Sequence, residues 1–139
     1  MPTEIEVQTA TPREHAEFVG DMLEFAGLDD ATVCTMVPSA ALVKFMRRSV
    51  IIGGACYVSG RPVSSDAALI HLFGLLEGHR GNKAGALALG SLEKRMAQEG
   101  IVIALLEPLN DAARGWFGGQ GYGLIPHTKY LGKPLPTQP

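Results

Sequence analysis

The sequence has little cysteine, no excess of charge of either sign and no long hydrophobic run. Its two cysteines, Cys34 and Cys56, lie far apart, which argues against a disulfide scaffold and predicts reduced, buried thiols. Twelve basic against fourteen acidic residues leave a formal charge of −2, so an overall basic surface for nucleic acid is excluded. No two of the four histidines have the spacing of a zinc-binding helix, and no metal is expected.

The longest apolar runs are Val50–Val58 and Ala67–Leu76. Both fall well short of the roughly 20 residues that span a bilayer, so no membrane association is expected. The first residues are acidic and lack the basic-then-apolar pattern of a signal peptide. These features predict a soluble, cytoplasmic protein.

The composition that is present is typical of one globular domain. Apolar residues make up 46% of the 139 residues and charged residues 19%, enough for a sizeable core. Seventeen glycines and nine prolines exceed their usual combined share of about 12% and predict many tight turns. We expect the domain to span residues 1–132. The remaining Lys133–Pro139 contains three prolines and is expected to form a tail outside the sheet.

The first part of the chain predicts a strand followed by helices. Polar and apolar residues alternate over Glu4–Thr9, as in a half-buried strand. Thr11, Pro12 and Glu14 then form a capping box for a helix that ends at Gly27. A second short helix is expected before residue 38.

Three strands are considered in the middle of the chain. The segment Ala40–Arg48 is ambiguous, because its apolar residues fit helical spacing as well as strand alternation. Val50–Val58 predicts a strand that ends in a turn. Ala67–Leu76 predicts a buried strand with Gly74 in its interior, which indicates a bulge or the close approach of another backbone or a ligand.

The last part predicts two helices and two strands. Ala84–Glu99 carries one apolar stripe of helical spacing, and the run Ile101–Leu106 predicts a central strand buried on both faces. The crossover is long enough to make this strand a parallel neighbour of Ala67–Leu76. Tyr122–Leu131 contains a final strand that is broken or edged by Pro126. Asp111–Gln120 predicts a short helix whose inward residues are Ala113, Trp116 and Phe117.

The loop from His79 to Ala86 joins a strand to a helix N-terminus. Small residues there expose backbone N–H groups, and the helix dipole adds positive potential, so the loop suits a phosphate or pyrophosphate group. Arg80 and Lys83 add formal positive charge. The alternative is that glycine and alanine only permit close packing of helix on sheet. The residues alone leave both interpretations open.

The order of these motifs resembles the GNAT-type N-acetyltransferases. Their central motif, Q/R-x-x-G-x-G/A, is matched by Arg80 and Gly85, with Lys83 in place of the first glycine. The family also shows a characteristic series after the next strand, matched by Asn110, Ala113, Phe117 and Gly121-Tyr122. The resemblance covers nearly the whole chain and favours a strand for Ala40–Arg48.

The resemblance implies an α/β (α+β) acyl-CoA N-acyltransferase fold: a mixed, mostly antiparallel sheet splayed around one parallel pair and flanked by helices. It implies acetyl-CoA as cosubstrate and direct transfer of the acetyl group to a primary amine. The cofactor-binding residues that it implies are Phe73, Gly74, Leu75, Arg80, Gly81, Asn82, Lys83, Ala84, Gly85, Ala86, Asn110 and Phe117.

The resemblance also suggests catalytic candidates. His71 lies near the position of a general base in many relatives, and a histidine pKa would suit that role; a hydrogen-bonded core histidine is the alternative. Glu77 and Glu107 follow the two central strands and are further candidates, or solvated loop acids. Phe117 stands where relatives place a tyrosine proton donor. Tyr122 is a replacement acid, with packing as its alternative, and so are Tyr57 and Tyr130.

Two rival functions remain. A catalytically degenerate member of the family would bind CoA or a protein partner in a regulatory or structural role. A purely structural α/β domain would use its small residues for packing and bind no CoA. The enzyme would require acetyl-CoA and an amine acceptor as partners. The strand within Tyr122–Leu131 could also pair with a second copy to form a homodimer.

Overall fold

The computed structural model describes residues 5–11, 41–60, 64–76, 83–108 and 110–136. The two helices expected between residues 11 and 38 lie outside these residues. The described elements are strands β1 (Glu6–Thr9), β2 (Ala41–Arg47), β3 (Val50–Gly60), β4 (Ser64–Leu75), β5 (Ile103–Leu106), β6 (Gly123–Leu124) and β7 (Leu131–Pro134), with helices α3 (Ala84–Gln98) and α4 (Asp111–Gly119).

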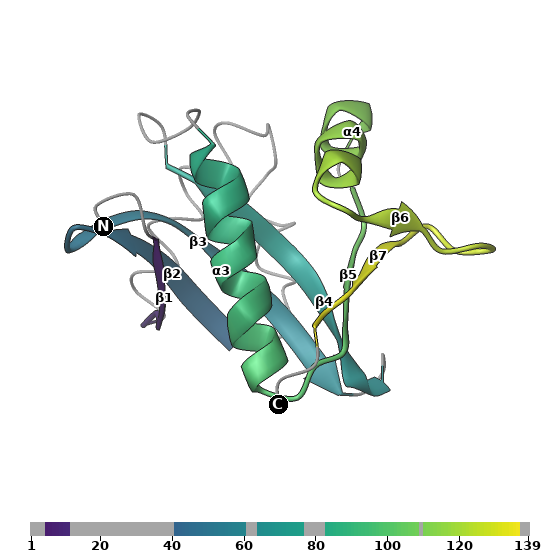
Figure 1. Ribbon diagram of the computed structural model, residues 1–139, viewed down its shortest axis with the longest axis horizontal. Coiled ribbons are helices and arrows are strands. Elements are labelled where there is room, and N and C mark those ends of the chain that lie inside the picture. Colours follow the sequence, from purple (N-terminus) through teal and green to yellow (C-terminus); the bar gives the residue numbers. More distant parts are fainter. Residues whose placement is uncertain (1–4, 12–40, 61–63, 77–82, 109, 137–139) are drawn as a thin grey trace.

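The strands form one seven-stranded sheet in the order β1-β2-β3-β4-β5-β7-β6. Every neighbouring pair is antiparallel except β4 and β5, which are parallel. The crossover between these two strands contains α3, which lies across one face of the sheet (Figure 1). The predicted fold class and the parallel pair are therefore confirmed. No helix in the described part of the chain is long and apolar enough to cross a membrane.

The ambiguous segment after residue 40 is a strand. β2 alternates, with Val43 and Phe45 fully buried between less buried neighbours. It pairs along its length with β3, whose residues Ile52 to Val58 are all buried. Tertiary pairing decides between the two periodicities here, because the same apolar residues would serve either element.

Helix α3 contributes a stripe of buried residues to the core. Leu89, Leu92 and Met96 are fully buried at helical spacing, as expected. The hydroxyl of Ser91 donates to the carbonyl of Ile5 at 2.7 Å and ties the helix to the chain before β1. Glu93 is also buried on this helix, which the apolar stripe did not predict.

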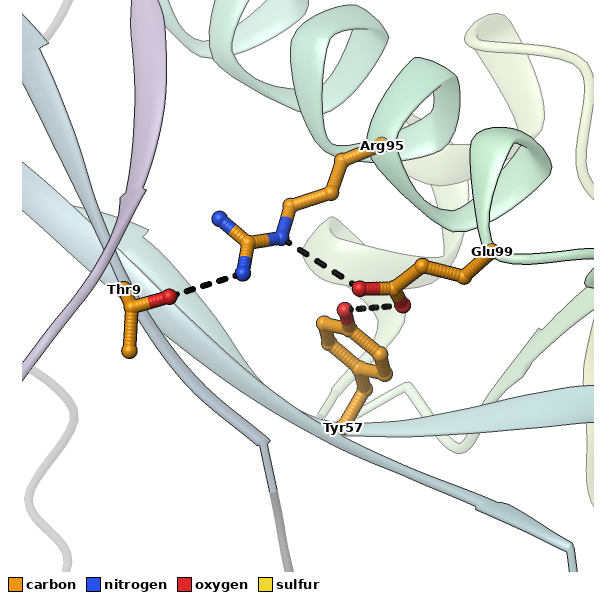
Figure 2. A network of polar contacts seen from close by, with 4 residues as sticks. All are labelled: Thr9, Tyr57, Arg95 and Glu99. Atoms are coloured by element: carbon orange, nitrogen blue, oxygen red, sulfur yellow. Dashed lines mark hydrogen bonds and ion pairs between the residues drawn. The ribbon is translucent and has the colours of Figure 1, made fainter.

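The C-terminal end of α3 is closed by backbone and side-chain bonds. Gly100 has φ +89° and donates to the Ala97 carbonyl, and the next amide reaches back to Met96; this is a Schellman motif. The hydroxyl of Tyr57 donates to Glu99 at 2.6 Å. Arg95 donates to Thr9 and forms an ion pair with Glu99 (Figure 2). Three elements, β1, β3 and α3, are thus joined at this end.

The bulge of β4 lies at His71 and not at Gly74. Tyr57 of β3 pairs with Ile70, whereas the preceding Cys56 pairs with Leu72, so His71 is the extra residue. Gly74 pairs in register with Gly54. The close contact in this region is at Gly53 of β3, where a Cβ would lie 2.3 Å from the Gly74 carbonyl oxygen.

The C-terminal part differs from expectation in three ways. The segment after Tyr122 forms a hairpin of two strands, β6 and β7. β7 continues to Pro134, and the next residue, Leu135, is buried and donates to the Val102 carbonyl. The sheet thus extends past the expected domain end at residue 132. β5 buries Ala104 and Leu106, but its other face is only half-buried, so it is not a strand covered equally on both faces.

Candidate active site

The parallel strands β4 and β5 pair over four residues and then separate. Within the described chain their register runs from Ala67 opposite Ile103 to Ile70 opposite Leu106. β4 continues to Leu75, paired only with β3. The separation begins next to the bulge at His71, and a bulge bends its strand and increases the local twist. The β5-facing edge of residues 71–75 therefore has no strand partner among the described residues, and its backbone groups are available to a ligand.

The N-terminus of α3 follows directly on this region. Lys83 is the N-cap residue, has φ 64° and ψ 10°, and makes no side-chain cap bond. The first turn contains no acidic residue. The first amides of a helix have no partner within the helix, and Leu87 is the first to donate, to the Lys83 carbonyl. Amides without a partner inside the helix, together with the positive helix end, are suited to an anion.

The conformation of Lys83 accounts for the glycine that the family prefers at this position. A φ of 64° lies in the left-handed region, which glycine adopts freely and other residues adopt at a cost of about 1 kcal/mol. The chain keeps the backbone geometry with a lysine. The Lys83 side chain is exposed, so its charge lies at the mouth of the helix N-terminus.

Helix α4 begins after β5 with a side-chain cap. The Oδ1 atom of Asn110 accepts from the Ala113 amide at 2.8 Å, and Asp111 places a negative charge in the first turn. The cap explains why the helix starts here. The cap thus uses the Oδ1 atom of Asn110 as an acceptor and leaves its NH2 group as a donor for a ligand.

Five aromatic rings connect α4 with the sheet; we call them the aromatic cluster. Phe73 lies at its centre, with ring centroids 5.5 Å from Phe45, 5.9 Å from Trp116 and 6.0 Å from Phe117. Phe117 also contacts Tyr122 at 5.6 Å. Phe73 and Phe117 are partly buried against the core. Trp116, expected to be a core residue, keeps 38% of its surface exposed.

The indole of Trp116 lies against the first turn of α3. A Cβ added to Gly85 would lie 3.1 Å from the indole Cζ2 atom. A methyl group at this position would require the ring to shift by a few tenths of an ångström. Gly85 thus has a packing role, because the indole fills the space beside its Cα atom.

Tyr122 has a structural position. Its hydroxyl is buried and donates to Glu93 at 2.8 Å, and Lys133 donates to the other carboxylate oxygen at 2.9 Å. Burial, and next the negative charge of Glu93, raise the pKa of Tyr122 well above its ordinary value. A buried phenol with a raised pKa and a carboxylate partner is a poor proton donor. The same applies to Tyr57, whose pKa is raised by burial and by Glu99.

Of the remaining predicted residues, most lie in the described part of the chain and four lie outside it. Phe73, Gly74 and Leu75 lie on the separated part of β4, and Lys83, Ala84, Gly85 and Ala86 on the first turn of α3. His71 is on β4 at the bulge. Glu107 is exposed and pairs with Lys129 at 3.3 Å. The residues that lie outside the described chain are Glu77, Arg80, Gly81 and Asn82.

Two features of the site were missed by the sequence reasoning. Glu93 was not singled out, although an acidic residue on the buried stripe of a helix is itself a signal of a buried polar network. The contact between Trp116 and Gly85 was not anticipated either. Among the described residues, no group of three His, Cys, Asp or Glu side chains is placed to bind a metal.

Comparisons with known proteins agree with this geometry. A model of the acetyltransferase (GNAT) family matches residues 5–122. Among curated proteins no sequence match is found. The structure of GCN5 from Tetrahymena is similar, with a TM-score of 0.76 at 12% identity, over 97% of this chain and 98% of that one.

One bacterial and one archaeal structure are also similar to this chain. An acetyltransferase from Thermus thermophilus has a TM-score of 0.69 at 18% identity, over 95% of this chain and 97% of the other. The PaiA N-acetyltransferase from Thermoplasma acidophilum, solved in complex with coenzyme A, has a TM-score of 0.69 at 14% identity, over 94% and 99%. At these identities the likeness concerns the fold.

Proposed function

Because the chain belongs to the acetyltransferase (GNAT) family, we propose that it transfers an acetyl group from acetyl-CoA to a primary amine. The observation that supports this most is the separation of β4 from β5 beside the uncapped N-terminus of α3. One feature offers unpaired strand backbone and the other offers free amides in a positive potential. A CoA donor has an amide-rich arm and a pyrophosphate, which are the complementary groups.

In this proposal the pyrophosphate lies on the amides of Ala84, Gly85 and Ala86. The ammonium group of Lys83 stands beside it, and Arg80, from the preceding loop, adds a second charge. The pantetheine arm lies along the free edge of β4 at Phe73–Leu75 and bonds to its backbone. The NH2 group of Asn110 reaches the arm from α4. PaiA, which shares the fold, was solved with coenzyme A, and this supports a CoA site here.

The chemistry needs few groups from the protein. The neutral amine attacks the thioester carbonyl, and its nitrogen forms a bond to the acyl carbon. The carbonyl electrons move to oxygen, where a backbone N–H near Gly74 or Leu75 stabilises the oxyanion. Collapse of the intermediate breaks the C–S bond, the CoA thiolate leaves, and the nitrogen loses a proton to a base. The products are the acetylated amine and CoA.

His71 and Glu77 are the proposed bases that remove the proton from the amine, directly or through water. Tyr122 was a candidate acid, but its buried hydroxyl is bound to Glu93, and we assign it to packing. Phe117 has no proton to donate. A thiol of ordinary pKa, about 8.5, can leave as the thiolate and be protonated by water.

A matched pair of variants tests the phosphate position. Ala86 is half-buried in the first turn of α3. Ala86→Glu places a carboxylate beside the proposed pyrophosphate, while Ala86→Gln has nearly the same shape without the charge. We expect the glutamate variant to weaken acetyl-CoA binding, measured by titration calorimetry, by about 100-fold more than glutamine does, because two negative charges close together in a partly desolvated site cost several kcal/mol. Equal binding by both variants would contradict the placement.

Turnover is measured separately as release of the free CoA thiol with a panel of primary amines. A second candidate function, a domain that binds CoA without catalysis, is favoured by one observation: none of the described tyrosines at the site has a free, exposed hydroxyl directed at it. That candidate predicts acetyl-CoA binding with no thiol release for any amine. The enzyme predicts thiol release that depends on the amine and saturates.

A further inference from the structure

We propose that Trp116 occupies part of the acyl donor's place in the unliganded protein, and that its indole must be displaced for the donor to bind. This inference rests on the proposed function. It assigns to Trp116 a role in setting donor affinity.

The position of the indole carries the argument. One side of the ring stacks against Phe73 of β4, with centroids 5.9 Å apart and planes at 25°. Its six-membered edge lies against Gly85 in the first turn of α3. Phe73 belongs to the segment proposed for the pantetheine arm, and Gly85 to the segment proposed for the pyrophosphate. A donor that runs from one segment to the other passes through the space that the ring fills.

The indole of Trp116 is only partly covered by its neighbours. Trp116 keeps 38% of its surface exposed, and α4 has no fully buried residue. The indole touches Phe117 edge-on at 4.9 Å, so both rings depend on the position of the same short helix. Displacing this ring from Phe73 and Gly85 therefore exposes less apolar surface than displacing a fully buried ring would, and hydrophobic cost is roughly proportional to that surface.

The backbone around Trp116 is easily deformed. Gly115, Gly118 and Gly119 all lie in α4, and a Cβ at any of them would meet nothing within 4 Å. Steric crowding therefore does not explain these glycines. Glycine is the poorest helix former after proline, so the three residues weaken α4 around the tryptophan. A weak helix that carries the blocking ring can move aside at low cost.

The chain offers a direct probe of this movement, because Trp116 is its one tryptophan. Intrinsic fluorescence at 295 nm excitation therefore reports on this indole alone. We expect added CoA to shift the emission maximum to longer wavelength and to increase quenching by iodide, as the ring leaves Phe73 and Gly85 for solvent. Adenosine 3′,5′-bisphosphate, which lacks the pantetheine arm, should give a smaller change.

The variant Trp116→Ala removes the obstruction. When a protein binds only in a minor state of up to about 10% population, its apparent affinity is reduced by that fraction. We expect Trp116→Ala to bind CoA about tenfold more tightly than the natural protein, measured by calorimetry. Leu124→Ala is the matched control: Leu124 is exposed on β6, and its truncation should leave CoA affinity unchanged.

Glycine variants keep the test independent of the Trp116 truncation. Gly115→Ala and Gly118→Ala strengthen α4 without a clash and should weaken CoA binding, because the closed position of the helix becomes harder to leave. Gly90→Ala, at an open and exposed site of α3, strengthens a helix that is not required to move. It should raise the unfolding temperature as the α4 variants do and leave CoA affinity as it was.

The outcomes separate the two proposals. CoA binding with unchanged emission, or Trp116→Ala binding no tighter than the natural protein, overturns the role of Trp116 and leaves the CoA site standing. Absence of CoA binding in the natural protein, Trp116→Ala and Gly115→Ala alike overturns the proposed function, and the displacement with it. Binding detected only in Trp116→Ala supports both.

Discussion

The two ends of helix α3 are built differently. At the C-terminal end, a Schellman motif satisfies the last carbonyls, and Tyr57, Arg95 and Thr9 join the helix to two strands (Figure 2). At the N-terminal end, Lys83 adopts a left-handed conformation and no side chain of the cap or first turn accepts from the amides. The ring that covers this end, Trp116, is part of a glycine-containing helix and is partly exposed.

This difference separates stability from binding along one helix. The closed end and the buried middle hold α3 on the sheet. At the open end the first amides have no partner within the helix and none from the Lys83 side chain, and such amides are suited to an anion. Regions that bind and move are commonly those with the lowest local stability. We therefore expect changes at the closed end to alter the free energy of unfolding. Changes at the open end should alter ligand affinity.

The largest effect on stability is expected at alkaline pH. Tyr57 and Tyr122 have pKa values raised above their ordinary value of 10.0, mainly by burial. Above that pH the unfolded chain loses these protons while the folded chain keeps them, so the free energy of unfolding decreases as pH rises. The decrease is about 1.4 kcal/mol per pH unit for each tyrosine.

Urea unfolding between about pH 10 and 12, a window that extends about two units above the ordinary tyrosine pKa, measures this slope. Tyr57→Phe removes the contribution of the closed end and Tyr122→Phe that of the buried middle, so each variant should show a shallower decrease. A double variant with the slope of the natural protein would contradict the role assigned to both hydroxyl groups.

A smaller effect distinguishes two glycines of the α3 segment. Gly100 has φ +89° in the Schellman motif, and Gly100→Ala should lower the free energy of unfolding by about 1 kcal/mol, because the left-handed conformation strains a side chain. Gly90 lies in the exposed helix interior, and Gly90→Ala should raise it by about 1 kcal/mol. Thermal and urea unfolding of both variants would show opposite signs; two changes of the same sign would refute the argument.

The smallest effect on stability is expected at the open end. Lys83→Gly removes the strain of a left-handed lysine, which raises the free energy of unfolding. It also adds backbone entropy to the unfolded chain, which lowers that free energy. The two effects of about 1 kcal/mol each nearly cancel. Lys83→Ala keeps the strain and removes the same charge. Both variants should weaken CoA binding by about 1 kcal/mol, the upper range for an exposed ion pair. Tighter binding by Lys83→Gly would show instead that the lysine obstructs the phosphate.

Much of the fold could be predicted from local pattern. The stripe of α3, the apolar run of β3 and the crossover that makes β4 and β5 parallel are properties of contiguous residues. β2 could not be assigned from pattern, because Phe45 and its neighbours fit either period, and only the family resemblance favoured a strand. The resemblance also indicated where strand, loop and helix would meet to form the candidate site.

What could not be predicted depends on partners distant in the chain. The bulge at His71 exists only in the register of β4 against β3. Glu93 is buried because Tyr122 and Lys133, 29 and 40 residues away, donate to it. The sequence predicts a tail at Lys133 and Pro134, because proline disfavours strands. In the structure these two residues pair antiparallel with β5. None of these pairings leaves a periodic signal within its own segment.

The central claim is that the open end of α3 and the free edge of β4 bind an acetyl-CoA donor. Thermal unfolding with and without millimolar acetyl-CoA, with CoA and adenosine 3′,5′-bisphosphate as comparators, tests it most directly. At a ligand concentration about 100 times its Kd, binding adds about 2.7 kcal/mol and raises the unfolding temperature of a domain this size by several degrees. The account predicts such an increase for all three ligands, largest for acetyl-CoA. An unchanged unfolding temperature with all three would contradict it.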